Sequence, residues 1–246
     1  MDDLIRTGIM GMDELLRGGF RRNLSILVTG SPGTFKTLMA LQFIYYGARD
    51  YNEKGIFITT EESISDIRGY AKTLEMDIDA YEKKGIISLI EKSVSTLKGG
   101  LVSADSMLQI IKKNKIKRIA LDSIVLFKYL YPADDKSEVE FRRHVLLFTH
   151  RLKKAGVTFM AVSEKSITNI DRIQYSELDF VFDALIMTAR ARKGAYFERI
   201  MSVIKVRGQE HSMDIYPMSI GKGGVSILND QTPFSLVDKE ETSKVR

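Results

Sequence analysis

The feature that most constrains this chain is a glycine-rich loop, Gly30 to Thr37, which reads Gly-Ser-Pro-Gly-Thr-Phe-Lys-Thr. An apolar run at 24–29 precedes it and is typical of a buried strand, and residues 36–48 have the apolar spacing of a well-buried helix. In a strand–loop–helix unit of this kind, backbone N–H groups and the helix N-terminus converge on phosphate. The sequence therefore predicts a nucleotide-binding α/β fold with a Walker A loop.

The residues of this loop have separate expected roles. Backbone N–H groups would cradle the β-phosphate, Lys36 would stabilise the terminal phosphates during binding and catalysis, and the Thr37 hydroxyl would ligate Mg²⁺. A glycine-rich turn that has lost nucleotide binding is the alternative, but such a turn has no reason to keep Lys36 and Thr37 together. We expect ATP and Mg²⁺ as ligands, with these nucleotide-binding residues: Gly30, Ser31, Pro32, Gly33, Thr34, Phe35, Lys36, Thr37 and Leu38.

Phe35 departs from the usual Walker A pattern, which has glycine just before the lysine. Glycine adopts a positive φ at little cost, whereas a bulky residue there stores about 1–3 kcal/mol of strain. Either the loop has an altered, unstrained geometry or Phe35 is strained. Both alternatives put fast turnover in doubt.

Length and composition favour one soluble domain. With 246 residues, 44% of them hydrophobic and 28% charged, we expect a domain over 1–236 and a charged tail over 237–246. The absence of cysteine excludes disulfides and thiolate sites and fits a reducing cytoplasm. No apolar run approaches the length of a membrane span, and the net charge of +5 is too modest to indicate nucleic acid. We therefore expect a cytoplasmic protein without a membrane partner.

Strand and helix patterns alternate along most of the chain, which predicts a mainly parallel sheet flanked by helices. The expected strands after the loop lie at 55–60, 86–90, 118–122 and 157–162. The expected helices lie at 63–73, capped by Ser63 or Ser65, and at 101–113 and 137–155. Four further strand-like runs, at 181–190, 196–206, 213–220 and 224–228, predict an antiparallel C-terminal extension.

Acidic residues follow three of the predicted strands, at the sheet edge where ligands of such folds bind. Asp122 ends its strand in the Walker B manner and would hold Mg²⁺, unless it is only a cap. Glu61 or Glu62 would polarise the attacking water, unless the pair are solvated first-turn helix residues. Ser163 and Glu164 would sense the γ-phosphate.

Taken together, these motifs resemble the KaiC family of RecA-like P-loop ATPases over about residues 5–230. The stretch 7–19 resembles the family's opening, and 57–62 resembles its strand with paired catalytic glutamates. Asp122 with Ser123 resembles its Walker B motif, and 205–208 followed by His211 resembles the segment that reaches a neighbour's nucleotide.

The resemblance implies a homo-oligomeric ring, usually a hexamer, with ATP between subunits. It also implies that Lys205 and Arg207 act in trans on phosphate and that His211 lies near the nucleotide. The residues themselves indicate only that Lys205 and Arg207 lie two apart on a predicted strand and share a face, which ordinary exposed charge would also do. Clock-type members carry two copies of this domain and this chain carries one, so a circadian role is not implied.

The leading functional prediction is a slow Mg²⁺-dependent ATPase. A nucleotide-gated scaffold with little hydrolysis is a second hypothesis, favoured by Phe35. A recombinase-like nucleic-acid-binding ATPase is a third, suggested by basic residues near one hairpin: Arg190, Arg192, Lys193 and Arg199. We do not favour the third, because we identify no aromatic stacking motif beside them.

Overall fold

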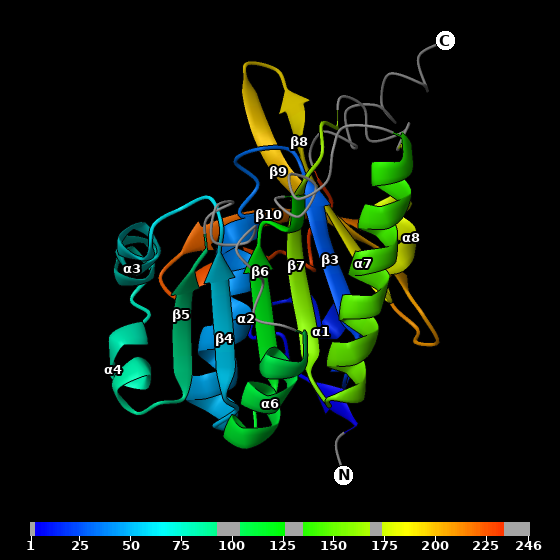
Figure 1. Ribbon diagram of the computed structural model, residues 1–246. Coiled ribbons are helices and arrows are strands. Elements are labelled where there is room, and N and C mark those ends of the chain that lie inside the picture. The colour runs from blue at the N-terminus through cyan, green and yellow to red at the C-terminus, as the bar shows by residue number, and fades with distance from the viewer. Residues whose placement is uncertain (1–2, 93–103, 126–134, 168–173, 234–246) are drawn as a thin grey trace.

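The computed structural model describes residues 3–92, 104–125, 135–167 and 174–233, and a nine-stranded sheet forms its centre (Figure 1). The strand order across this sheet is β11-β10-β9-β8-β3-β7-β6-β4-β5. The strand bounds are β3 Ser25–Gly30, β4 Gly55–Thr59, β5 Ile87–Glu91, β6 Arg118–Asp122, β7 Thr158–Glu164, β8 Ala184–Lys193, β9 Tyr196–Val206, β10 Ile215–Gly221 and β11 Gly224–Ile227. A small separate ribbon pairs β1 (Leu4–Ile5) with β2 (Phe20–Arg21).

The predicted α/β, RecA-like class is confirmed, with one correction to the point at which the antiparallel extension begins. Strands β5, β4, β6, β7, β3 and β8 run parallel, and β9, β10 and β11 continue the sheet with antiparallel pairing. The run at 181–190 was expected to open the antiparallel extension. It instead contains the end of a short helix, α8 (Glu177–Val181), and most of β8, which pairs parallel to β3. The antiparallel extension therefore begins at β9.

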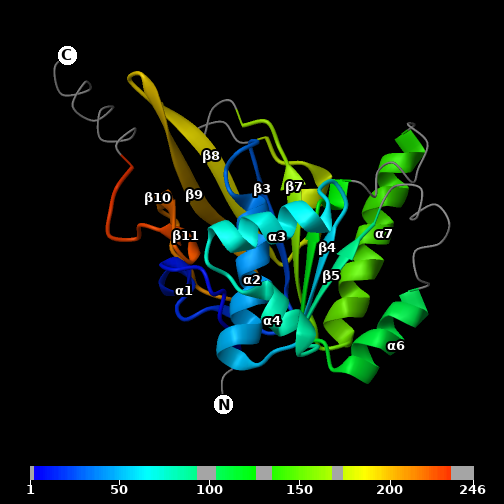
Figure 2. The same ribbon diagram turned by 90° about the vertical axis from the view of Figure 1, so that its left-hand side faces the viewer.

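Helices cover both faces of the sheet (Figure 2). On one face lie α2 (Lys36–Tyr51), α3 (Ile64–Thr73) and α4 (Ile78–Lys83), whose apolar residues join a first core cluster that includes Val28, Phe43 and Ile67. On the other face lie α6 (Ala104–Asn114), α7 (Asp135–Lys154) and α8, which join a second core cluster that includes Leu27, Phe159 and Leu185. A further helix of one turn, α1 (Met12–Leu15), lies near the N-terminus. Helix α4 was not predicted from the sequence.

The start of α3 is set by a capping box, which fixes the loop just before it. The Ser63 hydroxyl accepts the N–H of Asp66, and the Asp66 carboxylate in turn accepts the N–H of Ser63. Such reciprocal bonds satisfy helix N–H groups that lack an internal partner. The cap is therefore Ser63, one of the two predicted, and it ends the loop that carries Glu61 and Glu62.

Two polar clusters, one of them built on a buried arginine, lie at the opposite end of the sheet. Arg118 is 1% exposed; it pairs with Glu53 at 2.6 Å and donates to the Arg6 and Phe43 carbonyls. At the start of β3, the Asp183 carboxylate accepts from the Ser25 N–H and hydroxyl and pairs with Lys153. Burial by itself would raise the pKa of Asp183, but these contacts outweigh it and hold the pKa below its usual value.

Among the described residues, no helix combines the length and apolarity needed to cross a bilayer. The expected domain boundary at 236, the tail at 237–246 and part of the helix expected at 101–113 lie outside those residues.

Candidate functional site

The carboxyl ends of the parallel strands meet at one edge of the sheet (Figure 1). A cavity of about 300 Å³ opens at this edge. The strand registers pair Thr59 with Asp122 and Gly30 with Glu164, so these residues share that edge. The cavity is lined by Gly33, Thr34, Phe35, Lys36, Thr37, Leu38, Glu61, Glu62, Tyr70, Asp122, Val162 and Glu164. The structure thus brings together the Walker A lysine and threonine, the Walker B aspartate and the glutamate pair.

The phosphate loop is fastened to strand β8. Gly30 passes so close to Thr188 that a Cβ there would lie 2.0 Å from the Thr188 carbonyl oxygen, a contact that only glycine permits. The Thr34 hydroxyl donates to the Ser31 carbonyl at 2.8 Å and lies 2.7 Å from the Thr188 hydroxyl. Gly33, at φ 73°, has open space where its side chain would be. Of the predicted loop residues, Gly30, Ser31 and Pro32 shape the loop without lining the cavity.

Phe35 adopts the left-handed conformation, with φ 68° and ψ 17°, at the position before Lys36. Of the two alternatives for this loop, the strained one is therefore found: phenylalanine takes up the backbone conformation that glycine usually provides. Its ring packs against the first core cluster. The guanidinium of Arg199 stands 4.3 Å from the ring centroid.

The charged groups at the centre of the site perturb one another. Lys36 is 7% exposed, and its ammonium donates to the Ser31 carbonyl at 2.9 Å. Burial lowers the pKa of Lys36, and the charges of Glu164 and Asp122 act against that shift. Burial raises the pKa of Asp122 to about 6, while a hydrogen bond from the Thr37 hydroxyl opposes the rise. Such paired perturbations are characteristic of sites built to bind charge.

The two glutamates of the predicted catalytic pair have different surroundings. Glu61 is exposed, whereas Glu62 is partly buried, and the Thr59 hydroxyl donates to its backbone carbonyl at 2.7 Å. The Tyr70 hydroxyl donates to Glu62 Oε1 at 3.3 Å, and among the described side chains Oε2 is buried without a hydrogen-bond partner. Burial raises the pKa of Glu62, which favours its action as a proton acceptor near neutral pH. Tyr70 is not among the residues predicted from the sequence, because its distance from Glu62 depends on where α3 begins.

The two candidate sensors are separated by the pleat of β7. Glu164, the last residue of β7, lines the cavity, and its carboxylate acts on the Lys36 ammonium. Ser163 is 7% exposed, does not line the cavity, and its hydroxyl donates at 3.5 Å to the Glu164 carbonyl. Glu164 is therefore the one of the pair that lines this cavity.

Lys205 and Arg207 lie on the opposite side of the sheet from the phosphate loop. Strands β8 and β9 have a register shift between Leu185 and Ile186, and beside this shift Lys205 pairs with Leu185. Paired residues of neighbouring strands share a face of the sheet, so Lys205 lies on the same face as Leu185. Leu185 belongs to the second core cluster, whereas Phe35 packs against the first. The Arg207 guanidinium likewise donates to the Phe180 carbonyl of α8 at 2.7 Å. Neither cation lines the cavity of its own subunit.

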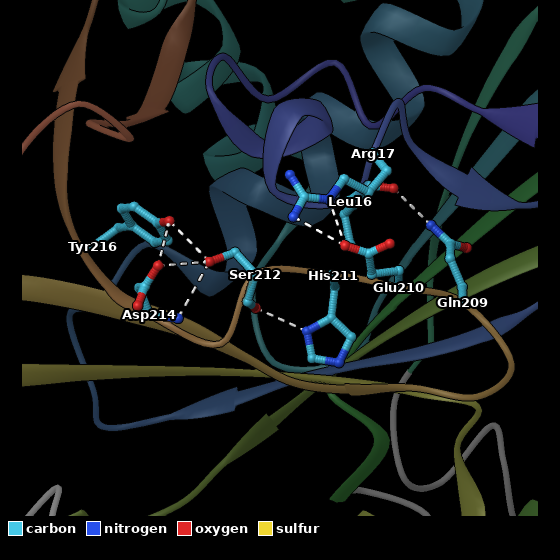
Figure 3. A network of polar contacts seen from close by, with 8 residues as sticks. All are labelled: Leu16, Arg17, Gln209, Glu210, His211, Ser212, Asp214 and Tyr216. Atoms are coloured by element: carbon cyan, nitrogen blue, oxygen red, sulfur yellow. Dashed lines mark hydrogen bonds and ion pairs between the residues drawn. The ribbon is translucent and has the colours of Figure 1, made fainter.

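The segment after β9 is tied to the N-terminal part of the chain, as Figure 3 shows. Gln209 donates to the Leu16 and Gly19 carbonyls, and Glu210 pairs with Arg17 at 3.1 Å. In the same turn the His211 Nδ1 lies 2.8 Å from the Ser212 carbonyl. His211, like Lys205, is held away from the cavity of its own subunit.

The basic hairpin β8–β9 carries exposed aromatic side chains that were not predicted to accompany its arginines. Tyr196 and Phe197, at the tip of this hairpin, are 59% and 61% exposed. Aromatic side chains therefore do accompany the arginines. The Arg190 guanidinium stands 5.6 Å from the Phe197 ring centroid, and Arg199 is directed to the phosphate loop. The arginines are thus engaged with neighbouring parts of the same subunit.

The chain is similar to known proteins over most of its length. The KaiC ATPase family model matches residues 5–232. Circadian clock oscillator proteins KaiC from Parathermosynechococcus lividus and Prochlorococcus marinus are 32% and 31% identical over 91% of this chain, which spans only 42% and 45% of their lengths. A crystal structure of a KaiC-like protein from Pyrococcus horikoshii OT3 superposes with a TM-score of 0.77 at 29% identity, covering 91% of this chain and 98% of that one. This chain therefore belongs to the KaiC family of ATPases.

Proposed function

We propose that this protein is a Mg²⁺-dependent ATPase that works as a homo-oligomeric ring, a hexamer, with ATP between subunits. The observation that carries the proposal is the single cavity in which Lys36, Thr37, Asp122 and Glu62 meet. The reaction is ATP and water to ADP and phosphate, with in-line attack on the γ-phosphate. In this reaction Lys36 stabilises the charge of the terminal phosphates from the base of the loop.

The residues around Asp122 fit a magnesium ion. The Thr37 hydroxyl and the Asp122 carboxylate lie within hydrogen-bonding reach of each other, and the described residues hold no cluster of three or more His, Cys, Asp or Glu ligands. A site with one hydroxyl and one carboxylate suits Mg²⁺, which keeps several waters and takes other ligands from phosphate. When bound, Mg²⁺ neutralises charge on the phosphate oxygens.

Glu62 is the residue that we assign to the attacking water. Its buried Oε2 has no partner among the described side chains, and its raised pKa makes it a better proton acceptor than an exposed carboxylate. Glu61 lines the same cavity but is exposed, which suits an electrostatic contribution. Glu164 is suited to sense the γ-phosphate because it ends β7 beside Lys36.

A shared site between subunits is supported by the face on which Lys205 and Arg207 lie. Lys205 shares a face with the second core cluster, Arg207 contacts α8, and neither lines the cavity that holds Lys36, so a phosphate bound at Lys36 would meet the two cations of a neighbouring subunit. Burial and the charge of Arg207 lower the pKa of Lys205. An anionic ligand would relieve that repulsion, and arginine suits the charge that develops on a transferred phosphoryl group.

Binding and hydrolysis are tested with three variants. Lys36→Ala should abolish Mg-ATP binding by calorimetry, whereas Lys222→Ala, which removes an exposed lysine remote from the cavity, should not change it. Glu62→Gln should keep ATP binding and stop phosphate release. Equal affinity of wild type and Lys36→Ala contradicts nucleotide binding at this loop. Tight binding without phosphate release in the wild type would favour the nucleotide-gated scaffold instead.

The ring is tested by mixing. Lys36→Ala and Arg207→Ala should each be inactive alone, but mixed oligomers contain interfaces in which both residues are intact, so mixing should restore part of the activity. Light scattering with and without Mg-ATP measures the assembly. No recovery on mixing, in oligomers shown to exchange subunits, contradicts a site completed in trans.

A further inference from the structure

Arg199 makes two contacts with the phosphate loop of its own subunit. Its Nε donates to the Gly33 carbonyl at 2.9 Å, and its guanidinium lies 4.3 Å from the centroid of the Phe35 ring. The first contact fixes the tip of the loop, and the second covers the residue that precedes Lys36. Together they span the part of the loop that would close around phosphate.

Phe35 needs such support because of its backbone. At φ 68° a residue with a Cβ is in a sparsely populated conformation that persists only where the surroundings hold it. The ring packs against the first core cluster. The Arg199 guanidinium also contacts the ring through a cation–π interaction.

The position of Arg199 follows from the sheet rather than from the loop. It lies on β9 directly opposite Arg190 of β8, and like charges in such a pair repel each other. Arg190 stands over the Phe197 ring, whereas Arg199 is directed to the loop. Two neighbouring arginines of one ribbon therefore have different partners, and Arg190 offers a matched control for charge.

We propose that Arg199 is a positioning residue for the phosphate loop in cis, so that Phe35 and Arg199 together replace the glycine of the usual loop. Arg199 holds Phe35 in its left-handed conformation and Gly33 in register, and the loop N–H groups are thereby pre-set to receive phosphate. The proposal deepens the ATPase proposal and rests on it for the identity of the ligand. It predicts that the contribution of Arg199 to nucleotide binding depends on Phe35.

The test is a double-mutant cycle on the full chain, with Mg-ATP affinity measured by calorimetry for wild type, Arg199→Ala, Phe35→Gly and the double variant. Arg199→Ala should weaken binding about five- to ten-fold, the value of one cation–π contact and one hydrogen bond together. In the Phe35→Gly background the same change should cost only about two- to three-fold, the value of the Gly33 hydrogen bond alone, since the partner of the cation–π contact is gone and glycine holds a positive φ unaided. Arg199→Lys should give an intermediate loss, because it keeps the cation and loses the Nε bond. Arg190→Ala should change affinity less than about two-fold, because it removes a neighbouring charge without a loop contact.

Hydrogen exchange of the amides of residues 33–37 in the free protein gives a second readout that needs no nucleotide. Exchange should be faster in Arg199→Ala than in wild type, with a smaller further increase when Arg199→Ala is added to Phe35→Gly, where only the Gly33 hydrogen bond is left to lose. An equal loss of affinity in both backgrounds, or a matching loss in Arg190→Ala, would overturn the proposal and indicate that Arg199 acts by charge alone. If wild type binds no Mg-ATP, the proposed function fails, and the exchange comparison by itself decides whether Arg199 positions the loop.

Discussion

Replacing Phe35 by glycine tests how this protein accommodates a bulky residue in its phosphate loop. The substitution removes three features at once: a Cβ held at φ 68°, a ring packed against the first core cluster, and a partner for the Arg199 guanidinium. Phe35→Ala is the matched control, because alanine loses the ring and keeps the Cβ. Comparison of the two variants separates strain from packing.

In Phe35→Gly, the strain that is relieved nearly offsets the contacts that are lost. In Phe35→Ala, the contacts are lost and no strain is relieved. Relief of a left-handed non-glycine conformation is worth about 1–2 kcal/mol. Loss of the cation–π contact costs about 0.5–1 kcal/mol, loss of a half-buried ring about 1 kcal/mol, and the greater freedom of unfolded glycine about 0.5–1 kcal/mol. We therefore expect the free energy of unfolding to fall by about 0.5–1 kcal/mol in Phe35→Gly. In Phe35→Ala, where no strain is relieved, it should fall by about 1.5–2 kcal/mol.

Urea denaturation of the nucleotide-free protein measures these differences, and for a domain of this size thermal melting should shift by about 2–4 °C per kcal/mol. The expected order of stability is wild type, then Phe35→Gly, then Phe35→Ala. If Phe35→Ala is as stable as Phe35→Gly, the strain at this position is only about 0.5–1 kcal/mol, enough to offset the unfolded-state cost of glycine and less than the value reasoned here. If Phe35→Gly is more stable than wild type, the ring contacts do not offset the strain, and the reasoning on Arg199 loses its physical basis.

Three further outcomes are expected. Arg118→Leu should lower the free energy of unfolding by about 3–5 kcal/mol in urea denaturation, because it removes a buried cation that pairs with Glu53, and a loss under about 1 kcal/mol would contradict this. Wild type should have a higher free energy of unfolding than Asp183→Asn at pH 7, and this difference should shrink below about pH 4, since the pKa of Asp183 is depressed in the folded state. Denaturation of both proteins at several pH values measures the difference, and a difference that does not change with pH would refute the prediction. Tyr70→Phe should move the acid limb of the kcat–pH profile to higher pH with KM for ATP unchanged, because the hydroxyl lowers the pKa of Glu62. An unshifted limb would mean that Glu62 is not the group that titrates.

The sequence by itself determined the features that depend on short stretches of chain. The order of strand, glycine-rich loop and helix lies within one short stretch of chain, and it predicted β3 and α2. The ends of two other apolar runs likewise predicted that Asp122 and Glu164 end their strands. Helix capping by Ser63 is also local, since its partner is three residues away. Strand alternation gave the parallel sheet, because fully apolar runs separated by helices have few other ways to be buried.

Only the tertiary structure decided the contacts that depend on register between distant strands. A shift of one residue in strand pairing moves a side chain to the other face of the sheet, and one such shift places Lys205 opposite to the loop. The parallel pairing of β8 with β3 similarly depends on where the chain returns after α8. Arg199 and Phe35 are 164 residues apart in the sequence, and the strand pairing brings them into contact. No local pattern in either segment encodes this contact. Local chemistry thus specified the phosphate site, and long-range register specified which charges surround it.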